Sequence, residues 1–176
     1  EEIEIDASGI EGGGIPYVSA TKGDDYSAFL AVVPGQFLAD IYLEYGSRLL
    51  EGNVRSFLSI RGKVNKSIRG TILQNPDLFF AYNNGIAATA TDIKTVFKDG
   101  RNLITDIKDM QIINGGQTTA SIANAVLQDK ADLTDIYVPM KLSVVDHDKA
   151  KDMIPNISRS ANSQNKVDEA DFFSNH

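Results

Sequence analysis

The sequence contains no cysteine, and only two of its 176 residues are histidine. The lack of cysteine excludes disulfides, thiol nucleophiles and cysteine-ligated metal sites. No paired-histidine spacing such as H-E-x-x-H is present, so the sequence also argues against a zinc site. No apolar run approaches the roughly 20 residues that a membrane-spanning helix needs, and no signal peptide is recognisable. These absences predict a cytoplasmic protein with no membrane partner.

The chain is acidic, with 24 acidic and 17 basic residues and a formal net charge of −7. This balance argues against wholesale coating of nucleic acid, although a local basic groove is compatible with it. The basic residues gather in one place, which is either a solvated helix face or a phosphate-binding patch: Arg55, Arg61, Lys63, Lys66 and Arg69.

Length and composition fit one globular domain. Residues 1–14 are acidic and glycine-rich, which predicts a flexible lead-in or boundary before a single α/β domain over residues 15–176. The first residue is Glu1 rather than methionine, and the segment 166–176 stops inside an acidic, helix-like pattern. We therefore expect a fragment of a longer protein, whose other parts would be partners of this domain.

Strands and helices are predicted to mix along the chain. Short runs of β-forming residues predict strands over 15–20, 28–33 and 136–145, a strand, turn and strand over 78–97, and a strand that follows Asp99-Gly100 and ends at Ile113. Helical spacing predicts helices over 35–50, around Ile68 and Ile72, over 116–128, and after Asp146. The fold class is therefore α/β (α+β), a mixed sheet with flanking helices.

One stretch, 110-MQIINGGQTTASIANAVL-127, joins a strand pattern to a helix pattern through two glycines and small polar residues. The first N–H groups of a helix lack intrahelical partners and carry a partial positive charge. Glycines let a ligand approach that backbone, so this geometry attracts phosphate or another anion. The alternative is structural, because glycine supplies a positive φ and threonine or asparagine caps a helix. The stretch matches neither the Rossmann nor the Walker A pattern.

Asparagine and other polar residues recur in further clusters, and asparagine favours caps and turns over helix interiors. Several such clusters in one chain suggest polar groups that converge on a common cleft. The candidate ligand residues are Asn114, Gly115, Gly116, Gln117, Thr118, Thr119, Arg55, Asn83, Asn84, Asn156, Arg159, Asn162, Gln164 and Asn165.

Five motifs follow one another along the chain: Asn53-Val-Arg55, Val64-Asn65-x-x-Ile68-x-x-Thr71, Phe80-x-Tyr82-Asn83-Asn84-Gly85-Ile86, Ile113-Asn114-Gly115-Gly116-Gln117-Thr118 and Asn162-Ser163-Gln164-Asn165. Over roughly residues 50–175, this series resembles the AIPR family, named for abortive-infection phage resistance in bacteria. Family members are considerably longer, which fits a fragment. The resemblance implies a bacterial antiphage defence protein.

A more distant resemblance is to the ParB/sulfiredoxin-like fold. The turn also resembles the D-G-Q-H-R motif of DGQHR-type domains, and Gln117 is the residue that the two share. In the ParB-like pattern a strand enters a turn and helix, and a later helix carries an E-N-x-x-R motif. The segment Asn156 to Arg159 occupies the place of that motif, with Pro155 in place of the acidic residue. The resemblance implies that this helix faces the glycine turn. The turn itself lacks the paired arginines that hold nucleotide phosphates in ParB.

We therefore predict an antiphage domain that binds the phosphate of a nucleotide or nucleic acid at the turn, with or without Mg²⁺. An alternative is a nuclease or nucleotide-cleaving enzyme that uses the same cleft, for which Asp106, Lys108 and Asp109 are the best carboxylate and lysine candidates. A further alternative is a non-catalytic interaction scaffold in which the amides only stabilise loops. No G-x-S-x-G motif supports a serine nucleophile, and His147 lies between two aspartates where a solvated helix cap is expected.

Overall fold

The computed structural model describes residues 2–52, 54, 55 and 65–164, and every structural statement below concerns these residues. The strands are β1 (Glu4–Asp6), β2 (Ile15–Lys22), β3 (Tyr26–Pro34), β4 (Ile86–Ala90), β5 (Asp92–Lys98), β6 (Arg101–Lys108), β7 (Gln111–Asn114) and β8 (Tyr137–Val145). The α-helices are α1 (Gly35–Tyr45), α3 (Lys66–Gln74), α4 (Phe79–Tyr82), α5 (Gly116–Asp129) and α6 (Ala150–Gln164), and the 3-10 helices are η1 (Gly46–Leu49), η2 (Pro76–Leu78) and η3 (His147–Lys149).

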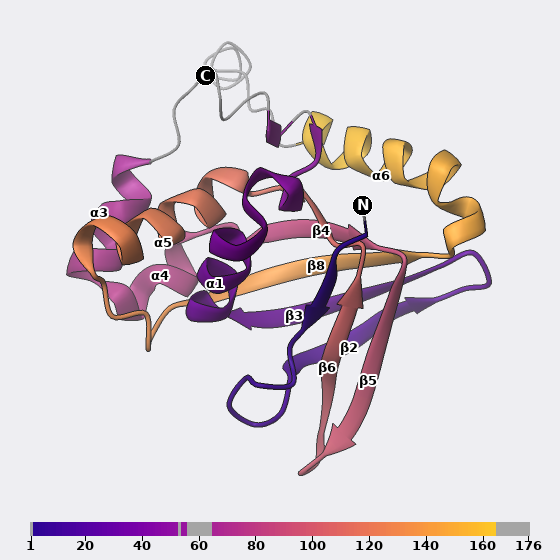
Figure 1. Ribbon diagram of the computed structural model, residues 1–176, viewed down its shortest axis with the longest axis horizontal. Coiled ribbons are helices and arrows are strands. Elements are labelled where there is room, and N and C mark those ends of the chain that lie inside the picture. Colours follow the sequence, from indigo (N-terminus) through magenta and orange to yellow (C-terminus); the bar gives the residue numbers. More distant parts are fainter. Residues whose placement is uncertain (1, 53, 56–64, 165–176) are drawn as a thin grey trace, which may run out of the picture.

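The strands form one 8-stranded sheet in the order β1-β6-β2-β3-β8-β4-β7, with β5 paired to β6. The pairing of β4 with β8 is parallel, and the other strand pairs are antiparallel. Figure 1 shows α1, α3, α4 and α5 gathered together and α6 lying apart from them. The predicted fold class, a mixed sheet with flanking helices, is confirmed.

The hydrophobic core lies between the sheet and the helices α1 and α5. Alternate residues of β3 and β8 point into it, and their register pairs Ala31 with Met140 and Phe29 with Leu142. On α1, Leu38 is fully buried in the same cluster. This helix ends at Tyr45, earlier than the predicted range 35–50, because Gly46 takes a φ of 61°, and residues 46–49 form η1.

The prediction of a strand at residue 78 and onward is wrong, because residues 76–82 form the helical turns of η2 and α4. A short apolar run fits a buried strand or a buried helical turn equally well. Here Pro76 occupies the start of η2, where its missing N–H and fixed φ favour a helical turn. The predicted positive-φ turn that follows is confirmed at Gly85, whose φ is 80°.

Two predicted strands are each divided in the structure. The stretch 86–97 is split between β4 and β5, and the stretch that ends at Ile113 is split between β6 and β7. The second break falls at Asp109, which has a left-handed φ of 54°. Of the resulting halves, β4 pairs with β7, whereas β5 pairs with β6. The breaks therefore let the sheet curl at these two places.

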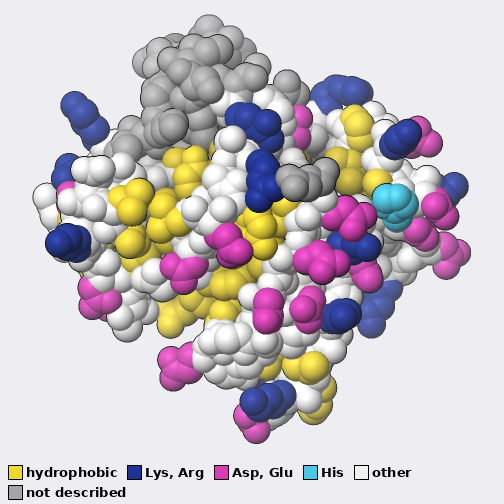
Figure 2. Space-filling model, in the orientation of Figure 1, with side chains coloured by type: hydrophobic (Ala, Val, Ile, Leu, Met, Phe, Trp, Pro, Cys, Tyr) yellow, Lys and Arg dark blue, Asp and Glu magenta, His cyan; other side chains and the backbone are white. Residues whose placement is uncertain are grey.

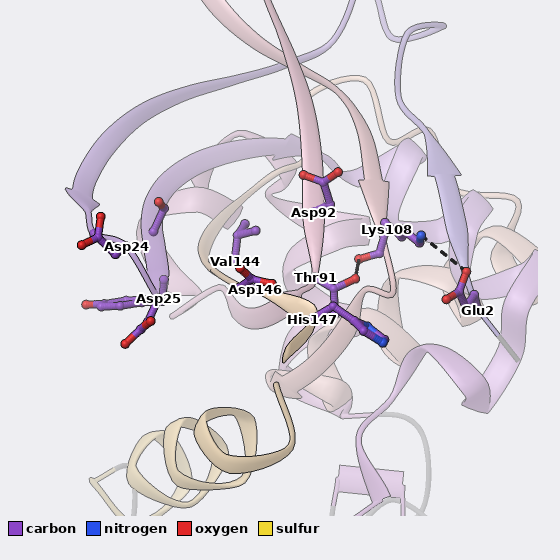
Figure 3. Close-up of a pocket in the computed structure, with 12 residues that line it drawn as sticks. Glu2, Asp24, Asp25, Thr91, Asp92, Lys108, Val144, Asp146 and His147 are labelled. Carbon is purple, nitrogen blue, oxygen red and sulfur yellow. Dashed lines mark hydrogen bonds and ion pairs between the residues drawn. The ribbon is translucent and has the colours of Figure 1, made fainter. Parts of the chain in front are cut away.

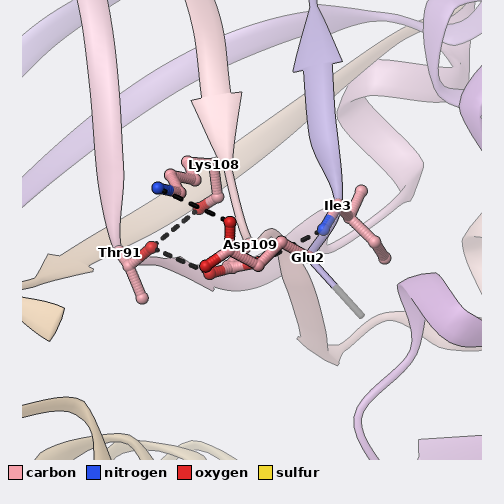
Figure 4. A network of polar contacts seen from close by, with 5 residues as sticks. All are labelled: Glu2, Ile3, Thr91, Lys108 and Asp109. Carbon is pink, nitrogen blue, oxygen red and sulfur yellow. Dashed lines mark hydrogen bonds and ion pairs between the residues drawn. The ribbon is translucent and has the colours of Figure 1, made fainter.

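Asp109 also attaches the N-terminal strand to the sheet (Figure 4). Its carboxylate accepts hydrogen bonds from the Ile3 backbone N–H and from the Thr91 hydroxyl, each at 3.2 Å. Its own backbone N–H donates to the Ile3 carbonyl at 2.6 Å. These contacts give Asp109, a candidate carboxylate of the nuclease alternative, a structural role.

Residues 4–6 of the predicted lead-in form the strand β1. Strand β1 pairs with β6, and the side chains of Ile3 and Ile5 are buried in the core. The physical reason is the alternation of isoleucine with glutamate, which places the apolar side chains on one face of a strand. The glycine-rich remainder, 7–14, connects β1 to β2.

Helix α6 packs against the far side of β7 and β8 from the hydrophobic core. Asn114 on β7 pairs with Ala87 on β4, and the residues on either side of Ala87 point into the core. The side chain of Asn114 therefore points to the other face of the sheet, where it contacts α6. Asp146 caps the short helix η3 that precedes α6, as predicted, by accepting the Asp148 backbone N–H. Within the described part of the chain, no helix has the length and apolar character required to cross a membrane.

Candidate functional site

The turn singled out in the sequence connects a strand to a helix, as predicted. Strand β7 ends at Asn114, and α5 begins at Gly116. Between them Gly115 is the N-cap residue of α5, with a left-handed φ of 90°. The two glycines therefore lie where the chain reverses direction between sheet and helix.

Gly115 has a clear structural requirement. A Cβ atom added here would lie 2.6 Å from the Gly85 carbonyl oxygen and 2.7 Å from the Ile86 Cγ2 atom. Contacts this short do not occur for real side chains, so only glycine lets α5 begin directly against the start of β4. At this position the structural interpretation of the glycine is sufficient.

The start of α5 has no side-chain cap among the described residues. The first intrahelical bond runs from the Thr119 N–H to the Gly115 carbonyl, so the amides of Gly116, Gln117 and Thr118 precede it. Helix α3 differs in this respect, because the Asn65 side chain accepts hydrogen bonds from two of its first N–H groups. The uncapped start of α5 keeps the partial positive charge of a helix N-terminus.

Amide side chains from two other segments converge on this start. The Asn83 side chain donates to the Thr118 hydroxyl at 3.1 Å and accepts the Gly85 N–H at 2.7 Å. The Asn65 side chain donates to the Gln117 side-chain oxygen at 3.4 Å, while its backbone N–H donates to the Ser121 hydroxyl. The predicted convergence is therefore present for Asn83, Gln117 and Thr118, and the network ties α3 and the loop after α4 to α5.

The C-terminal helix is linked to the same turn by Asn114, whose side chain donates to the Ala161 carbonyl at 3.3 Å. Nearby Ser158 is buried in α6, whereas Arg159 and Asn156 are exposed and bonded to each other at 3.1 Å. Because successive helical residues are about 100° apart, this pair lies on the side of α6 away from Ala161 and Ser158. Thus α6 abuts the turn, and its Arg159 faces outward.

The remaining predicted site residues form no hydrogen bond to this amide network among the contacts described. Arg55 donates to the Leu50 carbonyl at 3.0 Å, and Thr119 bonds back to the Gly115 carbonyl. Asn84 is exposed beside Asn83, and Asn162 is half-buried on α6. Gln164 is the last residue of α6, while Asn165 and the motif residues Asn53 and Val64 lie outside the described residues.

A cavity of about 310 Å³ adjoins the amide network, and sequence reasoning missed it. Its walls come from α3 and α4, and Asn83 belongs to both the cavity and the network. The signal available in the sequence was the pair of hydroxyl residues one helical turn apart on α3, next to the aromatic residues before Asn83. The lining residues are Ser67, Ile68, Thr71, Phe79, Tyr82 and Asn83.

A larger cavity, of about 520 Å³, lies at the opposite end of the sheet, where His147 and several carboxylates surround it (Figure 3). The carboxylates are spread around the rim, and Lys108 at one side forms an ion pair with Glu2 at 3.6 Å. Among the described residues, no group of three or more His, Asp or Glu side chains could hold a metal ion. This cavity therefore offers no convergent carboxylate set of the kind that a metal-dependent nuclease needs.

The cationic cluster predicted around α3 is partly neutralised. Arg69 forms a two-pronged ion pair with Asp129 of α5, with N···O distances of 2.6 and 2.9 Å. Hydrogen bonds from Arg69 lower the pKa of the Asp129 carboxyl from its ordinary value. Lys66 is exposed, and Arg61 and Lys63 lie outside the described residues. On the face in Figure 2, the described acidic and basic side chains are interspersed around exposed hydrophobic ones.

Together, the fold and the turn define a mixed α/β domain in which an uncapped helix start is braced by asparagine side chains from neighbouring segments. A family model described as AIPR protein matches residues 50–176, which include α3, the turn, α5 and α6. The chain belongs to the AIPR family, and this membership supports a role in antiphage defence by abortive infection. No curated protein and no solved structure matches the chain.

Proposed function

We propose that this domain contributes to antiphage defence by binding the phosphate group of a nucleotide or nucleic acid at the start of α5. The observation that carries the proposal is the uncapped helix start, where Gly115 stands in the position that a capping side chain usually occupies. An anionic oxygen placed there would accept from the backbone amides of Gly116 and Gln117. The half-exposed Gln117 side chain would add a donor.

The asparagines have a positioning role in this proposal. Asn83 and Asn65 hold Thr118 and Gln117 in place through their side chains, and Asn114 holds α6 beside the turn. A rigid site loses less conformational entropy when it binds, so such bracing favours affinity. Arg159, on the same α6, stays a proposed contact to a ligand that extends outward from the turn.

The scaffold alternative rests on the same hydrogen bonds, because an amide that bonds within the protein can serve the fold alone. A charge placed at the start of α5 separates the two. Gln117→Glu keeps the oxygen that accepts from Asn65, and a carboxylate in the first turn favours the helix by about 0.3–1 kcal/mol. The same carboxylate repels phosphate. A scaffold would therefore tolerate Gln117→Glu, whereas a phosphate site would lose affinity.

The experiment measures binding of inorganic pyrophosphate and of a short oligothymidylate by calorimetry, alongside thermal melts. The matched control is Gln128→Glu, which adds the same charge at the exposed C-terminal end of α5. We expect Gln117→Glu to lose about tenfold or more in affinity while Gln128→Glu binds as the parent does. Equal binding by the parent and both variants, or no binding by the parent, would contradict the proposal.

Arg159→Ala provides a second arm. Arg159 is exposed and bonded only within its own helix among the contacts described, so its removal should leave the melting temperature nearly unchanged. If Arg159 contacts the ligand, the oligothymidylate should bind more weakly and with a shallower dependence on salt. Unchanged affinity and salt dependence would remove Arg159 from the site.

A further inference from the structure

The cavity of about 310 Å³ between α3 and α4 has two kinds of wall. The apolar part is formed by Ile68 and by Phe79, which is 1% exposed and fills the core behind the cavity. The polar part is formed by the hydroxyls of Ser67 and Thr71 and by the Asn83 amide. Tyr82 completes the lining and is 66% exposed, so most of its ring is available to a ligand.

The cavity is joined to the start of α5 on two sides. Asn83 lines the cavity and donates to Thr118 in the first turn of α5. Asn65 caps the backbone N–H groups of Ser67 and Ile68, two of the three α3 residues that line the cavity, and its side chain also donates to Gln117. A ligand whose charged end lies at the start of α5 could therefore place its other end in this cavity.

The polar wall retains hydrogen-bonding capacity. The Asn83 side-chain nitrogen has two hydrogens, and one of them is used by Thr118. The Thr71 hydroxyl donates to the Ser67 carbonyl and keeps its lone pairs, so it can still accept. A donor and an acceptor beside an exposed aromatic ring suit a flat heterocycle that carries both groups at its edge.

We propose that this cavity binds the base of a nucleotide, with the ring stacked on Tyr82 and its edge facing Thr71 and Asn83. The inference rests on the proposed phosphate site and specifies its ligand as a nucleotide unit, free or within a single strand. The volume lies near the lower end of the roughly 300–1,000 Å³ of ligand cavities, which suits a base with its sugar. Stacking on an aromatic side chain tolerates any base, so Tyr82 supplies affinity and the polar wall supplies selectivity.

The test compares four ligands that divide a nucleotide into its parts: adenosine 5′-monophosphate, ribose 5-phosphate, adenosine, and a short oligothymidylate. It uses the parent chain, Tyr82→Ala, Tyr82→Phe and the control Phe97→Ala, which removes an aromatic ring that is 73% exposed on the β5–β6 hairpin. Because Tyr82 is exposed, its replacement should not unfold the chain, and thermal melts verify this.

We expect Tyr82→Ala to bind adenosine 5′-monophosphate or the oligothymidylate about fivefold to a hundredfold more weakly, with ribose 5-phosphate unaffected. Tyr82→Phe and Phe97→Ala should stay within about twofold of the parent, since the first keeps the ring and the second lies elsewhere. Binding of the monophosphate identifies a free nucleotide as the ligand, and binding of the oligothymidylate alone identifies a strand.

The two proposals fail in different ways. If ribose 5-phosphate binds as tightly as the monophosphate and Tyr82→Ala changes neither, the base cavity is refuted while the phosphate site stands. If adenosine binds and depends on Tyr82 while the phosphate adds nothing, the phosphate site is refuted while the base cavity stands. If none of the four ligands binds, the base cavity is refuted, and the phosphate site is refuted as well when inorganic pyrophosphate also fails to bind.

Discussion

Replacing Gly115 by alanine should be among the most damaging small changes in this chain. A residue with a side chain costs about 1–2 kcal/mol in the left-handed conformation that Gly115 adopts at φ 90°. The new Cβ would also meet the Gly85 carbonyl oxygen at 2.6 Å, and relief of such an overlap costs typically about 1–3 kcal/mol. The expected loss is therefore about 2–5 kcal/mol, a large part of the roughly 5–15 kcal/mol that stabilises an ordinary domain.

Gly100→Ala is the matched control for this change. Gly100 has a φ of 78° in the β5–β6 hairpin, and an added Cβ would find nothing within 4 Å. Gly100→Ala should therefore lose only the stability that the left-handed conformation costs, about 1–2 kcal/mol. Urea unfolding followed by circular dichroism measures both variants, and the slope of each transition should stay at the parent value.

The difference between the two variants isolates the packing of the turn against the start of β4. We expect Gly115→Ala to be less stable than Gly100→Ala by about 1–3 kcal/mol. If the two variants differ by less than about 0.5 kcal/mol, the close approach at Gly115 has no energetic role. The glycine would then need another explanation, such as the approach of a ligand.

Three further changes test the contacts around the site. Asn83→Ala should destabilise the fold by about 1–3 kcal/mol, because it leaves the buried Thr118 hydroxyl without its partner; a parental urea midpoint would contradict this. Asp109→Ala should cost about 1.5–3 kcal/mol and speed hydrogen exchange in β1, which its carboxylate holds; unchanged exchange would show that β1 is held otherwise. For the Arg69–Asp129 pair, the lowered pKa of the Asp129 carboxyl stabilises the fold above its ordinary pKa, and this contribution is lost as the pH falls through the lowered value. Arg69→Gln should raise that pKa toward the ordinary value in an NMR titration, and an unmoved titration would exclude the ion pair in solution.

Local pattern was enough to predict most elements and the turn itself. The spacing of apolar residues predicted α1, α3 and α5, and the glycine pair predicted the strand-to-helix turn with a positive φ. These features depend on interactions within a few residues of the chain, so they can be read from neighbouring side chains. The family resemblance was likewise carried by short motifs in a fixed order, and the match over residues 50–176 confirms it.

Local pattern failed where distant segments decide the outcome. Residues 79–82 were predicted as a strand but form α4, and Ile5, in the segment predicted as a lead-in, belongs to β1, which pairs with β6. In both places an apolar side chain, Phe79 or Ile5, is buried in a core built by distant segments of the chain. No local pattern in the sequence shows which distant segment will cover it.

The candidate site shows the same division. The sequence alone determined that an asparagine-rich chain carries a glycine-led helix start, because capping and φ preferences are local properties. Only the tertiary structure decided which amides brace the turn, since Asn65 and Asn83 meet Gln117 and Thr118 across more than thirty residues of chain. It also decided that Arg159 points outward and that a cavity adjoins Asn83. A polar side chain has many chemically equivalent partners, and only the packed fold selects which of them lies within hydrogen-bonding distance.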